Sequence, residues 1–320
     1  MSEIVVPANP GDRVTIEISA CPPCEPPYEL PPLSGFDVYA TKANQGPPSL
    51  PSSPAADDYY DALDSWYSLR ALGLNPPNNK TYWLQKYRDA FVIADGWKGA
   101  YLIHSGGCRE HYLETGDSQS LLALQRFVSV FPYTRDSDWQ SLANVEPREA
   151  GLIHKADCDL ILAGGSVPSQ RFNFRRQLCI NHIVAANSSG TGFKCFMIAE
   201  VARALLYSLK VDNSIQAEVT ALLSTLCDRL WAVYNQDSQG RWAFDYIAGD
   251  NSPAKDLNFI ICPIFWETAV LTGREDLLMR GDQAFESGVQ IHNWGLLKQY
   301  NQAFFNCPES ILKRQQFKPA

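Results

Sequence analysis

The feature of this sequence that most limits its fold is a helical pattern that stops and restarts from Asp58 onward. Apolar residues recur every three or four positions in long runs such as YDALDSWYSLRALGL and IQAEVTALLSTLCDRLWAVY. This spacing places apolar side chains along one side of a helix, whereas the alternation typical of strands is scarce after residue 58. The sequence therefore predicts an all-α body over residues 58–320.

Five short turns interrupt these helical runs. Four contain a glycine, at Gly73, Gly116, Gly164 and Gly273, and the fifth lies at Val211. A glycine in the left-handed conformation can end one helix, and an Asp, Ser or Asn just beyond it can cap the next. Because neighbouring turns are separated by about the length of two helices and a connection, we expect five or six helical hairpins.

Residues 1–57 have a different composition. A short β-like alternation around a Pro-Gly turn, EIVVPANPGDRVTIEIS, is followed by the proline-dense segments CPPCEPPYELPP and GPPSLPSSP. Proline cannot donate a backbone hydrogen bond, and such segments bury little apolar surface. We expect residues 1–57 to be an extended arm or tether, with a protein as its possible partner.

Charge and targeting signals exclude several classes of function. The 35 acidic side chains outnumber the 27 basic ones, which gives a formal charge of -8 and no general attraction to phosphate backbones or anionic lipid. Apolar runs are too short to span a bilayer, and no secretory leader is recognisable. We therefore expect a soluble, cytoplasmic or particle-associated protein that binds neither nucleic acid nor membrane.

Cysteine and glycine patterns predict neither a metal site nor a cofactor. The pair Cys21 and Cys24 has no second C-x-x-C or H-x-x-x-H partner, and we expect the other seven cysteines to be free, buried thiols. Phosphate-binding and dinucleotide-binding glycine motifs are also missing from the sequence.

Several segments resemble the helical hairpins of (α/α) toroid proteins, which include glycoside hydrolases, polysaccharide lyases and uronyl epimerases. They are YLETGDSQSLL, VLTGREDLL, REAGLIHKADCDLILAGG and GRWAFDYIAGDNSPAKDLNFIICPIFWE, and the resemblance covers roughly residues 58–300. It implies an (α/α)5-6 toroid that acts on a polysaccharide or oligosaccharide. An open α-solenoid is the competing architecture, but the long, irregular connections between hairpins favour the toroid.

Those long connections carry the candidate catalytic side chains. A glycosidase needs two carboxylic groups, for which Asp245 is the first candidate, with Asp95 or Glu149 as its partner. A lyase or epimerase needs instead a base such as His104 or Tyr246. We expect catalytic carboxylates, if present, to converge in one cleft.

Flat aromatic rings and polar groups in the same connections are typical of sugar-binding sites, since sugars present both C–H faces and hydroxyls. The candidates for substrate binding are Trp97, Trp139, Trp242, Asp256 and Arg148, the last as a partner for a uronate carboxylate. Three functions remain open: a polysaccharide hydrolase or lyase, a non-catalytic toroid that binds glycan or protein, and a virion tail or surface-assembly component anchored by residues 1–57.

Overall fold

The computed structural model describes residues 28–48, 50, 61–94, 103–129 and 146–320, together with the backbone of two short N-terminal strands. It divides into two units, Met1–Pro31 and Pro32–Ala320. In the first unit, β1 (Ile4–Val6) pairs with β2 (Val14–Ile16) in antiparallel register. The β-like alternation predicted for this segment is thus present.

The second unit is mostly helical, which confirms the predicted all-α class. Its strands, among the described residues, are the antiparallel pair β3 (Tyr234–Gln236) and β4 (Trp242–Phe244). The helices are α1 (Phe36–Gln45), α2 (Ala62–Ala71), α3 (Lys80–Trp83), the π-helix η2 (Leu84–Ala94), α4 (Gly106–Thr115), α5 (Ser118–Ser129), α6 (Pro147–Leu162), α7 (Ser169–Ser189), α8 (Cys195–Val211), the short 3₁₀ helix η5 (Asn213–Ile215), α9 (Gln216–Trp231), α10 (Asn258–Thr272), α11 (Glu275–Ile291) and α12 (Leu297–Arg314).

Helical hairpins form at each of the five predicted turns. The helix pairs α2 and α3, α4 and α5, α6 and α7, α8 and α9, and α10 and α11 are in contact. Gly116 and Gly273 end α4 and α10 with φ values of 69° and 68°, in the left-handed region expected of them. At the turn without glycine, the Asp212 carboxylate accepts a hydrogen bond from the Ser214 backbone N–H instead.

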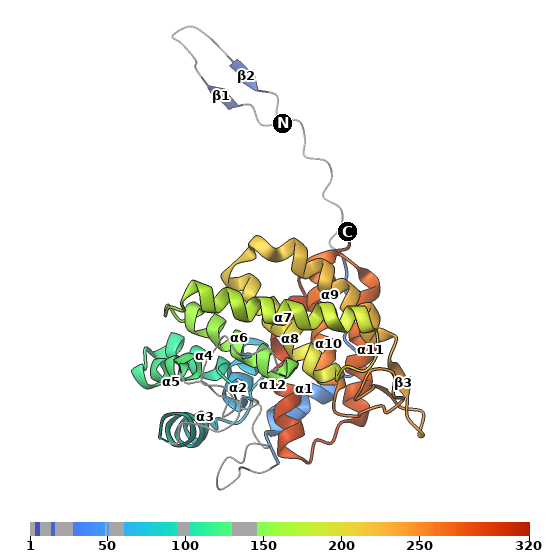
Figure 1. Ribbon diagram of the computed structural model, residues 1–320, viewed down its shortest axis with the longest axis horizontal. Helices are drawn as coiled ribbons and strands as arrows, with labels where there is room; N and C mark the ends of the chain where they lie inside the picture. The colour runs from blue at the N-terminus through green and yellow to red at the C-terminus, as the bar shows by residue number, and fades with distance from the viewer. Residues whose placement is uncertain are drawn as a thin grey trace. The chain divides into compact units, whose positions relative to one another are not determined.

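One helix of each hairpin contributes to a closed series of contacts. Helix α2 contacts α4, and the series continues through α6, α8, α10 and α12 back to α2. The other helices pack on this set; α7, for example, contacts both α6 and α8, and Figure 1 shows it lying across them. The long connections predicted to carry function lead into the N-termini of α4, α6 and α10.

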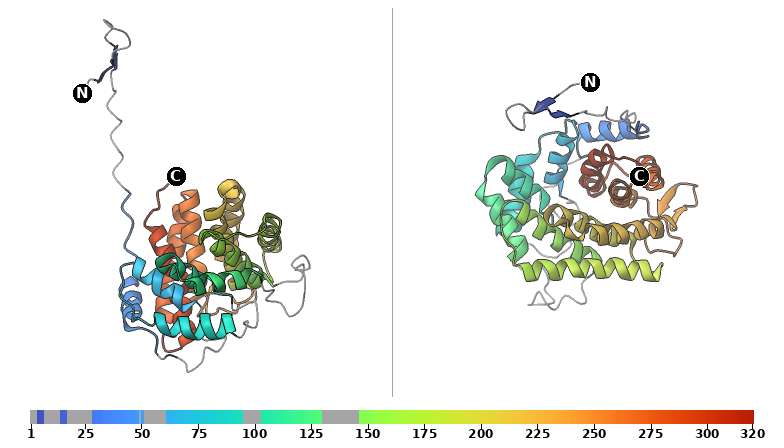
Figure 2. Two further views of the ribbon diagram at one scale, coloured as in Figure 1. Left: turned by 90° about the vertical axis from the view of Figure 1, so that its left-hand side faces the viewer. Right: turned by 90° about the horizontal axis from the view of Figure 1, so that it is seen from above.

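Helix α1 belongs to the helical unit, although the sequence places it in the arm. The arm was predicted to extend to residue 57, whereas the structural boundary follows Pro31. Tyr39 is fully buried in an aromatic cluster, with ring centroids 5.2 Å from Phe285 and 4.7 Å from Phe304. Figure 2 shows the blue α1 beside the red C-terminal helices. Proline-rich segments flank α1 in the sequence, and its burial depends on partners more than 200 residues away. The local pattern therefore does not predict this helix.

Two further expectations concern the state of the cysteines and the presence of membrane-spanning helices. All seven cysteines of the described residues are buried and free. Among these residues no helix has the length and apolar character required to cross a bilayer.

We predict that a chain beginning at Pro32 unfolds at the same temperature as the full chain, whereas one beginning at Asp58 unfolds about 10 °C lower. The second truncation removes Tyr39 and opens a cavity in the aromatic cluster, a loss comparable to that of a buried aromatic side chain. Thermal unfolding followed by circular dichroism measures both. Equal melting temperatures for the two truncations would show that α1 does not stabilise the helical unit.

Candidate functional site

A cluster of charged side chains is buried between the helices of the closed series. Each member is less than a tenth exposed, and they come from α2, α4, α6 and α8. They are Asp64, Arg109, Lys155, Asp159, Glu200 and Arg203. Burying a charge is unfavourable unless it is paired or hydrogen-bonded, so each side chain must either have a partner or serve another purpose.

Asp159 holds the centre of this cluster together. Its Oδ2 accepts hydrogen bonds from the Lys155 ammonium, at 2.8 Å, and from the Ser105 hydroxyl, while its Oδ1 accepts one from Arg109. Burial opposes ionisation, but Lys155 and Arg109 outweigh it and hold the pKa of Asp159 below its ordinary value. Asp159 is therefore an ionised, fully satisfied carboxylate that joins α4 to α6.

The N-terminus of α2 lies directly against the N-terminus of α4 because Gly106 and Gly107 have no side chains. A Cβ on Gly106 would lie 2.4 Å from Asp64 Oδ2, and one on Gly107 would lie 2.6 Å from Asp61 Oδ1. Asp61 uses this close approach to accept hydrogen bonds from the backbone N–H groups of Asp64 and Gly107. The two glycines thus allow the carboxylates of Asp61 and Asp64 to lie against the N-terminus of α4.

Asp64 and Glu200 differ from Asp159 in their surroundings. Neither carboxylate accepts a hydrogen bond from any residue that the structure describes. Burial raises the pKa of both, while Lys155 and Arg203 act on both in the opposite direction. The carboxyl groups of Asp64 and Glu200 therefore lie near Lys155 and Arg203 without accepting a hydrogen bond from either.

Arg203 is itself held by neutral acceptors. Its guanidinium donates to the side-chain oxygen of Asn306, at 2.6 Å, and to the backbone oxygen of Phe305, at 2.9 Å. It also lies over the Phe305 ring, 4.1 Å from the centroid. Its positive charge is thus fixed in place by α12 without being neutralised by a bonded carboxylate in the described chain.

His104, one of the predicted bases, borders this cluster. Its backbone N–H donates to the Tyr87 hydroxyl, and its ring packs edge-on against Phe305. Burial, followed by the charges of Lys155, Arg148 and Arg203, lowers the pKa of His104 to about 3. The imidazole is consequently neutral at physiological pH and is a weaker base than an exposed histidine.

Two further predicted residues meet on the Phe196 ring, at the N-terminus of α8. The Arg148 guanidinium lies over this ring, 5.7 Å from its centroid, and the Tyr246 ring packs against it at 5.3 Å. Tyr246 is 43% exposed. Glu149 follows Arg148 in the first turn of α6 and is partly buried.

Asp245, the first catalytic candidate, instead holds its own loop together. It is fully buried, and its two oxygens accept hydrogen bonds from the Asn235 amide and the Gly249 backbone N–H. The position of Asp256 is fixed through its backbone oxygen, which accepts a hydrogen bond from the Gln302 amide. Both residues lie on the stretch between β4 and α10.

Trp242, which the sequence predicts to bind sugar, exposes its ring to solvent. It is 39% exposed and stacks on Tyr234 at 5.5 Å, with 23° between the ring planes. Asp95, Trp97 and Trp139 lie outside the described residues.

Sequence reasoning missed Asp64 and Glu200 because it looked for function in the connections between helices. A signal was present in the run FKCFMIAEVARALLYSL, where Glu200 and Arg203 are the only charged residues after Lys194 in an otherwise apolar helix. Charged side chains are rarely fully buried, so charges inside an apolar stretch point to a buried polar cluster.

The described residues show no metal site at this cluster, and no known protein was found to match the chain. Within the described residues, no group of three or more His, Cys, Asp or Glu side chains is arranged to hold a metal ion. Comparisons with protein-family models, curated proteins and solved structures found no match.

We predict that replacing Asp61 by Asn removes part of the pH dependence of stability. Burial and then the charge of Asp64 raise the pKa of Asp61 from its ordinary 3.8 to about 7. A group with a raised pKa stabilises the fold most below its unfolded value, and this contribution is lost as pH rises through the folded value. The wild-type advantage over Asp61→Asn should therefore shrink between about pH 4 and pH 7.

Urea denaturation of both proteins across this range measures the difference in unfolding free energy. Asp37→Asn, a change at an exposed carboxylate in the first turn of α1, is the control and should show a constant difference. A constant difference for Asp61→Asn would mean that Asp61 ionises like an exposed carboxylate.

Proposed function

We propose that this chain is an (α/α) toroid enzyme that cleaves a polysaccharide or oligosaccharide by acid–base catalysis, with Glu200 and Asp64 as its reactive carboxyl groups. The toroid is supported by the closed series of contacts from α2 through α12 and by the second helix of each hairpin, which packs against its partner in this series. Both carboxyls are buried and belong to helices of the series, Asp64 to α2 and Glu200 to α8.

The observation that carries the proposal is the pair of buried carboxyl groups without hydrogen-bond donors in the described chain. Both the hydrolysis and the elimination of a glycosidic bond require proton transfers at neutral pH. A carboxyl group whose pKa is raised by burial can remain protonated and donate to the leaving oxygen. The raised pKa of Glu200 fits this role.

Asp64 fits the complementary role of base or nucleophile. Three cations, Lys155, Arg109 and Arg203, oppose the effect of its burial and favour its ionised form. The charge of Asp64 in turn raises the pKa of neighbouring Asp61. His104 suits the role of base less well than Asp64, because burial and the same cations lower its pKa to about 3.

In this proposal the substrate is bound by residues at the N-terminal ends of α6 and α8, on β4 and in the loop after β4. The exposed rings of Tyr246 and Trp242 suit the C–H face of a sugar, and Arg148 beside Tyr246 suits a carboxylate or hydroxyl. Asp95 and Trp97, which precede α4, Trp139, which precedes α6, and Glu149, in the first turn of α6, remain candidates from the sequence.

We predict that Glu200→Gln and Asp64→Asn each lower turnover by at least about a thousandfold, because each removes a proton-transfer group while keeping the shape of the side chain. Neutral and uronic polysaccharides are the substrates, and both new reducing ends and the absorbance of unsaturated products are followed. The second readout separates elimination from hydrolysis.

Glu218→Gln is the matched control, since Glu218 is exposed on α9 and the change of charge is identical. It should leave turnover unaltered. Activity retained in folded Glu200→Gln and Asp64→Asn would reject these two residues as catalytic. Tight glycan binding without turnover in the wild-type protein would favour a non-catalytic toroid.

A further inference from the structure

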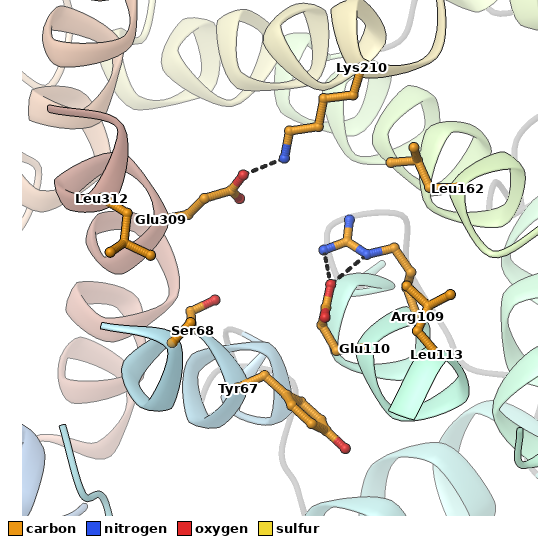
Figure 3. A pocket seen from close by; sticks show the side chains of 10 residues that line it. Tyr67, Ser68, Arg109, Glu110, Leu113, Leu162, Lys210, Glu309 and Leu312 are labelled. Carbon is orange, nitrogen blue, oxygen red and sulfur yellow. Dashed lines mark hydrogen bonds and ion pairs between the residues drawn. The ribbon is translucent and has the colours of Figure 1, made fainter. Parts of the chain in front are cut away.

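A hollow lies among helices of the closed series. Residues of α2, α4, α6, α8 and α12, most of them in the C-terminal halves of these helices, surround a cavity of about 520 Å³. Figure 3 shows side chains from these helices directed toward one space. The volume falls within the range of small-molecule sites.

The buried charge cluster separates this cavity from Asp64 and Glu200. Arg109 lines the cavity, but its guanidinium also reaches inward to Asp159, which is fully buried and bound by Lys155. Tyr207 of α8 connects the two regions, since its hydroxyl donates to Glu309 in the cavity wall and the Lys155 ammonium lies 4.5 Å from its ring centroid. A molecule in the cavity therefore meets Arg109, whose guanidinium is already bonded to Asp159.

Every charge in the cavity wall has an opposite charge bonded to it. Arg109 donates to Glu110, and Lys210 donates to Glu309, whose other oxygen accepts the Tyr207 hydroxyl. Burial opposes ionisation of Glu309, but Lys210 and Lys313 hold its pKa well below the ordinary value. The wall thus carries two positive and two negative side chains with no net charge.

Apolar side chains form the rest of the wall. Leu113, Leu162 and Leu312 come from three different helices, and Leu113 is 56% exposed. Ser68 adds a hydroxyl from α2. A charged molecule would have to compete with an existing ion pair, and a hydrocarbon would cover the charges without replacing their hydration.

We propose that this cavity is a second binding site, and that it takes a neutral saccharide. A sugar hydroxyl can accept from Arg109 or Lys210 and donate to Glu110 or Glu309 without separating either pair. The C–H face of the ring covers the leucines, as the apolar part of such a site requires. This site is distinct from the proposed catalytic carboxyls and does not depend on their activity.

The test is a titration of the full-length protein with sugars that differ in one group, followed by NMR. Methyl glucoside, glucuronate and glucosamine compare neutral, anionic and cationic forms of one ring, and maltose, cellobiose and lactose extend the neutral series. We expect neutral sugars to bind at least fivefold more tightly than either charged form.

Two variants with equally exposed side chains locate the binding. Leu113→Ala removes part of the cavity wall and should weaken the binding of neutral sugar about tenfold. Met279→Ala, at a residue that is also 56% exposed but lies on α11, should not change it. Glu110→Gln should weaken binding as well, because the amide nitrogen replaces a carboxylate oxygen that accepts hydrogen bonds.

Binding that survives Glu200→Gln but weakens in Leu113→Ala assigns the sugar to this cavity, whatever the outcome for turnover. Tighter binding of glucuronate or glucosamine, no binding by any of the neutral sugars, or equal affinities in Leu113→Ala and Met279→Ala would overturn the proposal. A change in turnover alone bears on the proposed function and not on this site.

Discussion

The ion pairs around Asp159 are the interaction on which the rest of the helical unit depends. A carboxylate with no exposed surface is tolerable only because Lys155, Arg109 and Ser105 all donate to it. These donors fix the positions of α4 and α6 relative to each other. Removing Lys155 or Arg109 would leave part of the buried Asp159 charge uncompensated, which is strongly unfavourable.

The same cluster gives the two ends of the helices different chemistry. On one side, Lys155 and Arg203 face Asp64 and Glu200, whose carboxyls have no donor in the described chain and whose pKa values are raised by burial. On the other side, Arg109 is shared between Asp159 and Glu110, so the cavity wall has no charge left to offer. One network thus borders carboxyls without donors in the described chain on one side and mutually paired charges on the other.

Local sequence patterns predicted the hairpins because a turn depends on residues that adjoin it. Gly116 and Gly273 adopt the left-handed conformation for reasons visible within a few residues. Tyr39 and Asp245 show where this reasoning ends. Tyr39 is buried by partners from α10 to α12, and Asp245 became a loop-holding group because Asn235 and Gly249 fold back onto it. The partners of Tyr39 are more than 200 residues away, and Asn235 reaches Asp245 only through the pairing of β3 with β4, so the residues adjoining Tyr39 and Asp245 do not reveal these contacts.

The position of Glu200 depends on Gly151 in the neighbouring helix α6. A Cβ on Gly151 would lie 2.8 Å from the Glu200 backbone oxygen, so α6 and α8 approach this closely only because residue 151 has no side chain. Lys155 lies one turn beyond Gly151 and therefore on the same face of α6. The glycine that permits the contact thus also sets the ammonium near the carboxyl group. In α10, Pro263 deprives the Phe259 carbonyl of its helical donor, and the Cys307 thiol of α12, 3.4 Å away, replaces it. Helices α10 and α12 also meet through a charged group, because the Ser310 hydroxyl and the Lys313 ammonium both donate to the Glu267 carboxylate. This carboxylate is bonded to a cation, whereas Glu200 has no such partner in the described chain, so the two buried glutamates differ in their surroundings.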